Sequence, residues 1–444
     1  MCIYSQTDIQ RKKAMDELVS TGKKPLVGFF PVFYNLAETG RAVLIAKRYI
    51  ELGGEAVFFS HGGEYEYLAK DLGCEVIRVH PIYTKEFIDR LWKASRLETL
   101  RNPYSTQDIL DHVEGEISAY KKTSIKLIVS TNNTTCVISA RVLKIPLIFV
   151  RSRFNPQFTY YPEDAEILFT HIVPEWLKLK ILNWYFPHAK HYLPPFVKVA
   201  KKYHVTPPKT GHALTKGDYT FYTDFQQLAN IKDDKHSPDE YYIGPIFFDE
   251  LIKKNIEKNE VVAQEEAIHK HLKRKGRSIL ISLGSSGTRE MFIKMLELLN
   301  NTDYTVLGVF TSILKDDELP AFNENILLRK FVPSLEKIFT LVDLAIIHGG
   351  QGTVYTAAYA GKPVIGFPML LEQHSNLEML ARQGMAKIAS RKSIEKNLLP
   401  MIKDIFDNYD EYLTKAQSLS KRLPKPDGDR IAAHLIYQII SKNA

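Results

Sequence analysis

From residue 25 onward, short runs of apolar, β-prone residues alternate with longer amphipathic segments, and this alternation constrains the fold more than any other feature of the sequence. In the first half the runs are PLVGFF, EAVFFS, CEVIRVHP, KLIVST and IPLIFV. Such runs, separated by segments of helical length, are typical of parallel βαβ units. The first half is therefore predicted to be α/β, with an open parallel sheet.

The same alternation returns in the second half. Between about 151 and 245 the pattern is interrupted by Pro and aromatic residues, and a strand-like YYIGPIFF ends this stretch. It restarts with SILISLG, YTVLGVF, ILLRKF, LAIIHGG and PVIGFP, with helices predicted over 288–299, 334–340, 353–360 and 374–383. A chain of 444 residues, 45% of them hydrophobic, can bury two such cores.

We therefore predict two Rossmann-like, doubly wound domains facing an interdomain cleft. The first covers 1–245 and is joined by a C-terminal helix over 427–444, whereas the second covers 246–426. Ligands of such sheets bind outside the carboxyl ends of the strands.

Charge and cysteine content narrow the class of protein. The formal net charge of +8 is scattered along the chain, which fits an anionic ligand or an anionic membrane surface, and no basic helix or aromatic platform motif indicates nucleic acid. The three cysteines have no CxxC spacing and indicate a reducing compartment. Without a signal-like N-terminus or a long apolar run, the expected location is the cytoplasm, with peripheral contact to the inner face of a membrane left open.

The stretch His348-Gly-Gly-Gln-Gly-Thr353 lies between a buried-type strand and a predicted helix. A glycine loop at this point lets backbone N–H groups approach an anion, and the helix dipole favours negative charge there. The imidazole of His348 could donate to the same anion. The stretch is either a diphosphate loop or a simple tight turn.

Two further segments support the first interpretation. Ser282-Leu-Gly-Ser-Ser-Gly-Thr288 repeats the small-residue pattern after the first strand of the second half. Glu372 and Gln373 follow the next strand, where a carboxylate and an amide can bind the vicinal hydroxyls of a sugar.

The segment from Lys330 to Ala386, KFVPSLEKIF through LARQGMA, resembles the nucleotide-sugar-binding half of GT-B-type glycosyltransferases. The resemblance is to the UDP-glycosyltransferase family and its bacterial macrolide, sterol and MurG-like relatives. It extends more loosely from residue 278 and is only architectural in the first half.

The resemblance implies a role for each matching residue. Val332 would lie at the uracil, Ser285 and Ser286 after Gly284 would approach the phosphates, and Asn376 would lie on the phosphate side. Glu372 and Gln373 would hold the donor sugar. The diphosphate would be bound by His348, Gly349, Gly350, Gln351, Gly352 and Thr353.

Two positions depart from the family pattern. Thr356 stands where the family commonly has a ribose-binding glutamate, and no histidine follows the first strand, FFPVFYNLAETGR, to act as general base. Glu38 in that loop and His61 after EAVFFS are alternative base candidates. Their other interpretations are an N-terminal helix charge and a turn residue.

Other conspicuous groups of residues are weaker evidence for a functional site. His188 and His191 have no third ligand nearby, and Asp427-Gly-Asp429 fits a helix N-cap, so no metal site is expected. The stretch from Trp176 to Lys202 is an acceptor wall, a membrane-contacting patch or an irregular connection.

The function predicted is inverting transfer of a hexose from a nucleotide sugar, most simply a UDP-sugar, to an acceptor hydroxyl, without cofactor or essential metal. The acceptor is unknown, and a lipid or membrane-associated glycoconjugate fits the basic, aromatic first half. A sugar-nucleotide 2-epimerase and a non-catalytic nucleotide-sugar-binding protein are the alternatives.

Overall fold

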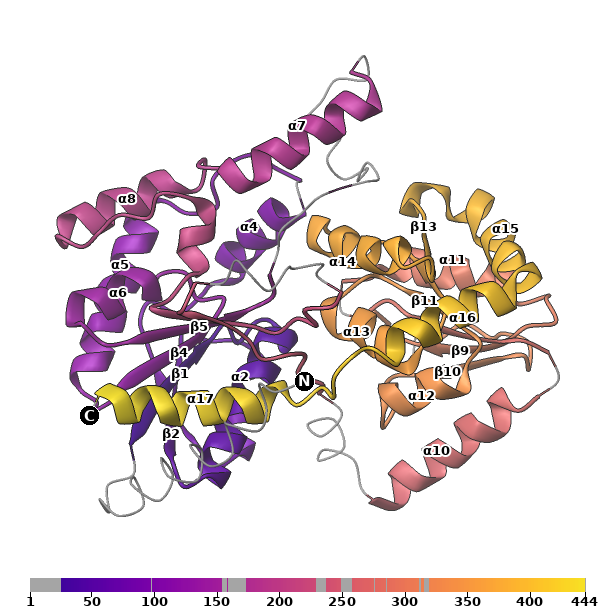
Figure 1. Ribbon diagram of the computed structural model, residues 1–444, viewed down its shortest axis with the longest axis horizontal. Coiled ribbons are helices and arrows are strands. Elements are labelled where there is room, and N and C mark those ends of the chain that lie inside the picture. The colour runs from indigo at the N-terminus through magenta and orange to yellow at the C-terminus, as the bar shows by residue number, and fades with distance from the viewer. Residues whose placement is uncertain are drawn as a thin grey trace.

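The structure is a computed structural model, and it describes residues 25–96, 98–153, 158, 173–228, 237–248, 258–274, 276–284, 286–310, 313–314 and 319–443. Within these residues the chain forms two parallel sheets lying side by side, each covered by helices (Figure 1). The doubly wound architecture expected from the sequence is therefore present twice.

The first sheet has the strand order β3-β2-β1-β4-β5-β6-β7, and its registered pairs are parallel. Its strands are β1 Leu26–Pro31, β2 Glu55–Ser60, β3 Glu75–Arg78, β4 Leu127–Thr131, β5 Leu147–Arg151, β6 Tyr219–Tyr222 and β7 Glu240–Tyr242. Its helices are α2 Leu36–Glu51, α3 Glu66–Asp71, α4 Lys85–Ser95, α5 Thr106–Lys121, α6 Cys136–Leu143, α7 Glu175–His188 and α8 Leu193–Lys202, with a 3-10 turn over Gly211–Thr215.

The second sheet has the order β10-β9-β8-β11-β12-β13 and is also parallel. Its strands are β8 Ser278–Ser282, β9 Thr305–Val309, β10 Ile326–Arg329, β11 Leu344–Ile347, β12 Val364–Gly366 and β13 Ala386–Ile388. Its helices are α10 Lys258–Leu272, α11 Arg289–Leu299, α12 Leu335–Leu341, α13 Gln351–Ala360, α14 Leu371–Arg382, α15 Ile394–Asp407 and α16 Tyr409–Ser420.

In each sheet the order in which the chain adds strands reverses at one point near the centre. In the first sheet this point lies between β1 and β4, and in the second between β8 and β11. The loops at the carboxyl ends of these strands leave toward opposite faces of the sheet, which is where doubly wound folds bind their ligands. The fold thus singles out four loops before any side chain is considered.

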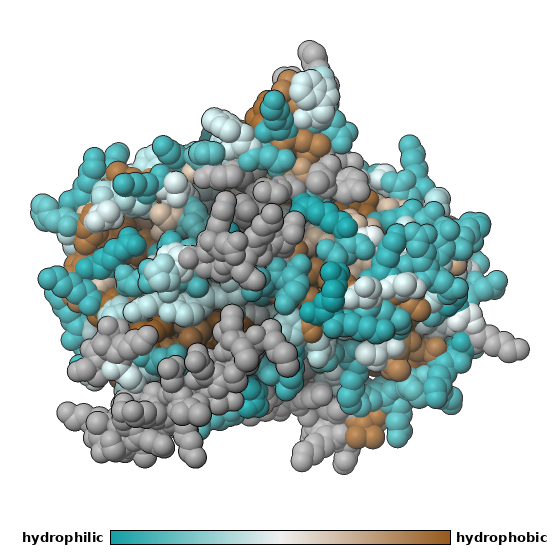
Figure 2. All heavy atoms as spheres, viewed as in Figure 1, coloured by the Kyte–Doolittle hydropathy of each residue, from teal (hydrophilic) through white to brown (hydrophobic). Residues whose placement is uncertain are grey.

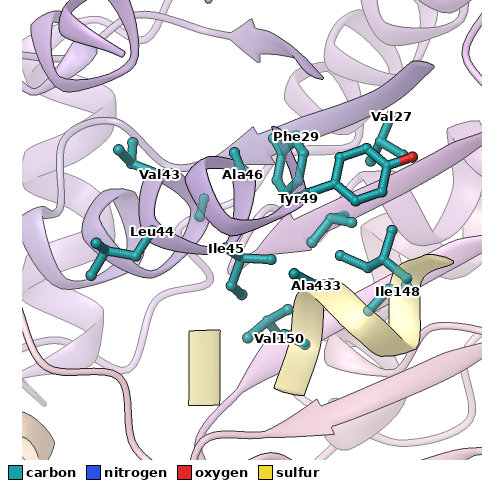
Figure 3. Packing of buried hydrophobic residues seen from close by; sticks show 14 of the residues in the cluster. Val27, Phe29, Val43, Leu44, Ile45, Ala46, Tyr49, Ile148, Val150 and Ala433 are labelled. Carbon is teal, nitrogen blue, oxygen red and sulfur yellow. The ribbon is translucent and has the colours of Figure 1, made fainter. Parts of the chain in front are cut away.

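The final helix, α17 Gly428–Asn443, returns to the first domain and packs on α2. Figure 3 shows Ala433 of α17 among Val27, Phe29, Ile45 and Ile148 of the first domain. Arg48 on α2 also donates to Asp429 on α17 (Nε to Oδ2, 2.6 Å). The two sheets fall on either side of residue 245, and the domain bounds 1–245 with 427–444 and 246–426 remain a prediction.

The structure differs in several places from what the sequence predicted. The stretch from Trp176 to Lys202 is not irregular, because it forms α7 and α8. Strand β7 ends at Tyr242 rather than at Phe248. Helix α13 begins at Gln351, two residues before the predicted start, so the glycine loop runs directly into the helix. No helix in the described part of the chain is long and apolar enough to cross a membrane.

Candidate nucleotide-sugar site

The loops that follow β8 and β11 lie next to each other at the point where the strand order of the second sheet reverses. The two strands are paired in parallel, with Ile347 opposite Ser282. His348, the first residue after β11, lies with Nδ1 3.4 Å from the carbonyl oxygen of Ser282. The two loops that the sequence predicted to hold one ligand are therefore in contact.

Glycine is required at two positions because the imidazole of His348 fills the adjoining space. A Cβ at Gly284 would lie 2.6 Å from His348 Cε1, and a Cβ at Gly350 would lie 2.4 Å from Nε2. Gly284 also has a φ of +57°, which favours glycine. These two glycines shape the loops around the histidine.

The buried imidazole of His348 is neutral at pH 7. Burial lowers its pKa to about 4, since desolvation disfavours the charged ring. A hydrogen bond to the Ser282 carbonyl oxygen places the proton of the neutral ring on Nδ1. In this state Nε2 is an acceptor and cannot donate to a phosphate.

The N-terminus of α13 forms the rest of this loop. Its N-cap residue, Gly350, makes no side-chain capping bond, so the helix dipole and the N–H groups of the first turn are available to an anion. A Cβ at Gly352 would meet nothing within 4 Å, so this side of the turn borders open space. Asn376 supports the loop from α14 by donating to the carbonyl oxygen of Gly349 (3.0 Å).

The two residues expected to bind the sugar differ in their surroundings. Gln373 is buried, and both ends of its amide are engaged: Oε1 accepts from the Met369 amide and Nε2 donates to Ser286 Oγ, each at 2.8 Å. Glu372 is exposed and accepts a 3.3 Å hydrogen bond from Ser152 Oγ of the first domain. Gln373 thus joins two loops of the site, while Glu372 reaches across to the other domain.

The side chain of Gln351 connects the glycine loop to the first domain. Its Oε1 accepts from Arg41 Nη2 at 2.6 Å, and its Nε2 donates to the carbonyl oxygen of Thr223 and to Asp224 Oδ1, both at 3.1 Å. Tyr355, one helical turn further along α13, donates to the same carboxylate oxygen (2.6 Å). The sequence predicted only the backbone of Gln351 as part of the site, so this interdomain contact was missed.

Glu38 lies in the first turn of α2, directly after the β1 loop. Its Oε1 accepts from Arg41 Nη1 (3.0 Å), whereas its Oε2 is buried and has no hydrogen-bond partner among the described residues. Burial raises the pKa of the Glu38 carboxyl, and the charge of Glu372 raises it further, while Arg41 opposes the shift. The carboxyl therefore has an increased affinity for a proton.

His61, the other base candidate, belongs to an internal network. Its Nδ1 lies 3.1 Å from the carbonyl oxygen of Val79 and 2.9 Å from that of Pro81, and Nε2 lies 3.2 Å from Glu116 Oε1. The His61 side chain is buried, and Glu116 is fully buried. Since both ring nitrogens already face protein atoms, the geometry favours Glu38 over His61.

The remaining predicted residues lie around these loops. Val332 follows β10 at the same edge of the sheet and is buried next to the exposed Phe331. Thr353 lies in the first turn of α13. Thr356 donates to the carbonyl oxygen of Gly352 (2.8 Å) and offers no carboxylate for a ribose. Ser285 lies outside the described residues.

The histidines and acidic residues that the sequence raised as possible metal ligands have other partners. His188 and His191 bond through Nδ1 to the Trp184 carbonyl oxygen and the Tyr185 hydroxyl, respectively. Asp429 pairs with Arg48. Among the residues that the structure describes, no group of three His, Cys, Asp or Glu could hold a metal ion.

Comparisons with known proteins agree with this geometry. Residues 264–429 match the model of the glycosyltransferase family 28 C-terminal domain. A segment of 182 residues, 37% of the chain, is 28% identical to UDP-N-acetylglucosamine--N-acetylmuramyl-(pentapeptide) pyrophosphoryl-undecaprenol N-acetylglucosamine transferase 1 of Bacillus cereus. The match covers 48% of that relative, so the chain spans about half its length.

Longer matches include the first domain. The chain is 23% identical over 311 residues to a PGL/p-HBAD biosynthesis glycosyltransferase of Mycobacterium tuberculosis, covering 69% of the chain and 68% of the relative. The crystal structure of CalG4, the calicheamicin glycosyltransferase, matches 95% of the chain and 100% of its own with a TM-score of 0.65 at 14% identity. The fold is therefore that of GT-B glycosyltransferases, and the resemblance found in the sequence is confirmed.

Proposed function

We propose that this chain transfers a hexose from a UDP-sugar to an acceptor hydroxyl, with inversion at the anomeric carbon. The observation that carries the proposal is the link between the two domains. The glycine loop at the start of α13 is joined through Gln351 and Arg41 to the carboxyl of Glu38. A binding element for a leaving diphosphate and a carboxylate with a raised pKa therefore belong to one site.

The donor would lie over the carboxyl edge of the second sheet. The amides from Gly349 to Thr353, with Ser285 and Ser286, would bind the diphosphate, and Val332 would border the uracil. Glu372 and Gln373 would hold the sugar, the latter from within the loop structure it stabilises. Support comes from the open space at Gly352 and the contact between the two loops.

In the proposed reaction the acceptor hydroxyl oxygen attacks the anomeric carbon while the Glu38 carboxylate accepts its proton. The bond from the anomeric carbon to the diphosphate oxygen breaks, and UDP leaves with the electron pair. Amides and the helix N-terminus stabilise the negative charge that develops on this oxygen. We propose that these groups suffice without cofactor or essential metal, so EDTA should leave turnover unchanged.

The acceptor is proposed to be a lipid or a membrane-associated glycoconjugate. The name of the Bacillus cereus relative includes pyrophosphoryl-undecaprenol. This fits a basic, aromatic first domain and a cytoplasmic protein that contacts a membrane peripherally.

A panel of UDP, dTDP and GDP sugars in a thermal-shift assay tests the donor. Saturation by a specific donor at about 100-fold excess over its Kd should add about 2.7 kcal/mol of stability. Product analysis with and without candidate acceptors tests the chemistry. Stabilisation by no nucleotide sugar would refute the proposal, and an epimerised sugar formed without acceptor would show a 2-epimerase instead.

A further inference from the structure

Helix α7 exposes a face with two tryptophans. Trp176 and Trp184 are 66% and 65% exposed, and Ile181 between them is 40% exposed. Trp176, Lys180 and Trp184 are spaced four residues apart and so lie along one side of the helix. In Figure 1 the helix projects above both domains, and Figure 2 shows hydrophobic and hydrophilic residues together on this projection.

Other residues of α7 anchor the helix to the protein. Leu182 is fully buried. The side-chain amide of Asn183 accepts from the Phe158 amide (2.7 Å) and donates to the Phe158 carbonyl oxygen (2.9 Å). The exposed tryptophans are therefore presented by a helix that is held in place, and large apolar side chains grouped on a surface indicate an interaction site.

The segment that carries these tryptophans is basic in sequence. From Pro174 to Tyr203 the sequence contains six lysines, and its one acidic residue is Glu175. Lys180, Lys190 and Lys198 are exposed. Tryptophan favours the interface between lipid and water, and lysines near an anionic bilayer are attracted to its surface. A protein partner would need matching pockets for both rings, whereas a bilayer accepts them without such complementarity.

We propose that the exposed face of α7, together with the lysines of α7 and α8 and Lys190 between them, is a docking surface for an anionic lipid bilayer. The tryptophan rings insert at the level of the lipid headgroups, and the lysines bind the anionic headgroups around them. The helix lies on the membrane and does not span it.

This surface is connected to the candidate site. Phe158, held by Asn183 of α7, contacts the ring of His374 on α14 edge to face, with centroids 5.8 Å apart. His374 follows Glu372 by two residues and Gln373 by one. Docking through α7 therefore brings the sugar end of the site near the bilayer, from which the acceptor hydroxyl would come. This last consequence rests on the proposed function, whereas membrane binding itself does not.

Vesicle flotation of the full chain, without donor or acceptor, tests the proposal. Vesicles containing phosphatidylglycerol should bind the protein, vesicles of phosphatidylcholine alone should bind it much more weakly, and added salt should release it. Brominated lipids should quench the tryptophan fluorescence on binding. Equal binding to both vesicle types, or none to either, would overturn the proposal.

Two double variants identify the surface. Trp176→Ala/Trp184→Ala should lower partitioning at least about tenfold, and Lys180→Gln/Lys190→Gln should lower it about fivefold per lysine removed. The matched control, Lys396→Gln/Lys421→Gln on the second domain, also removes two exposed lysines. If it lowers binding equally, the effect is one of net charge and the proposal fails.

Two measurements distinguish membrane docking from the proposed function and from dimer formation. The tryptophan variant should keep the thermal shift produced by a UDP-sugar, because it leaves the donor loops intact. If a UDP-sugar produces no thermal shift in the wild type, the proposed function is contradicted, but docking is not. A dimer that dissociates in the tryptophan variant without lipid would assign the face to a second copy of the chain and overturn the proposal.

Discussion

At the scale of single residues, Glu38 is the group whose substitution separates chemistry from folding. We expect Glu38→Gln to lower turnover by about 100-fold or more, because the acceptor loses its general base. Since the pKa of Glu38 is raised, turnover in the wild type should fall on acidification at a pH above the ordinary range of a glutamate. Turnover measured across pH tests both statements, and full activity of the variant would exclude Glu38 as the base.

The same shift predicts how the variant affects stability. A carboxyl whose folded pKa is raised adds stability below its unfolded pKa, and this contribution is lost as the pH rises through the folded pKa. At a pH above its folded pKa, the ionised, buried Glu38 therefore opposes folding. Glu38→Gln should keep or raise the melting temperature at neutral pH, with unchanged donor affinity as the control for an intact site.

His348 predicts a second dependence on pH. A donor diphosphate near Nε2 favours the protonated ring, so donor binding should raise its pKa from about 4. Affinity for a UDP-sugar should therefore increase as the pH falls from neutral toward 5, and His348→Asn should abolish this increase. Calorimetry in two buffers of different ionisation enthalpy would detect the proton taken up. An affinity that is constant over this range in the wild type would contradict the expectation.

Gln351 shows what sequence could and could not predict at this scale. The pattern HGGQG predicts a loop whose amides face an anion, and the structure places this loop at the start of α13. The partners of the Gln351 side chain are Arg41 and Asp224, which lie 310 and 127 residues away in the sequence. No local spacing could indicate these contacts, because they depend on how the two domains are packed.

At the scale of elements, the glycines of the α13 loop differ in whether a side chain could replace their hydrogen without a clash. Gly350→Ala would place Cβ 2.4 Å from His348 Nε2, so it should displace the imidazole, lower stability and weaken donor binding. Gly352→Ala, whose Cβ meets nothing within 4 Å, should leave the stability of the free protein unchanged or raise it by up to about 1 kcal/mol. Thermal melts without ligand compare the two, and equal melting temperatures would contradict this account.

The elements that sequence predicted well are those with regular alternation. Strands β8 and β11, with the helices that follow them, were found within about two residues because buried parallel strands are continuously apolar. Helices α7 and α8 were not predicted. Pro194 and Pro195 in the first turn of α8 look like helix breakers, although Pro is tolerated there. Helix α7 is apolar on several sides, so it shows no clear helical period.

At the scale of the whole molecule, the Gln351 contact should couple the two domains. Gln351→Ala leaves Arg41, Asp224 and the Thr223 carbonyl without this partner, so we expect a loss of about 1–3 kcal/mol in stability. Turnover should fall more than donor affinity, because Glu38 and the donor loop are no longer held together. Gln383→Ala, which removes a more exposed hydrogen bond to Arg422, is the matched control. Identical kinetics in the two variants would show that the contact plays no part in turnover.

The packing of α17 on α2 also bears on how the protein is made. Ala432, Ala433, Ile436 and Ile440 belong to the hydrophobic core of the first domain, yet the ribosome adds them only after the entire second domain. During translation the second domain can therefore complete its core first. The first domain is synthesised earlier, but one of its apolar faces stays uncovered until α17 has been added. The nascent chain should therefore depend on chaperones mainly through its first domain, and premature termination before residue 428 should leave that domain the more prone to aggregation.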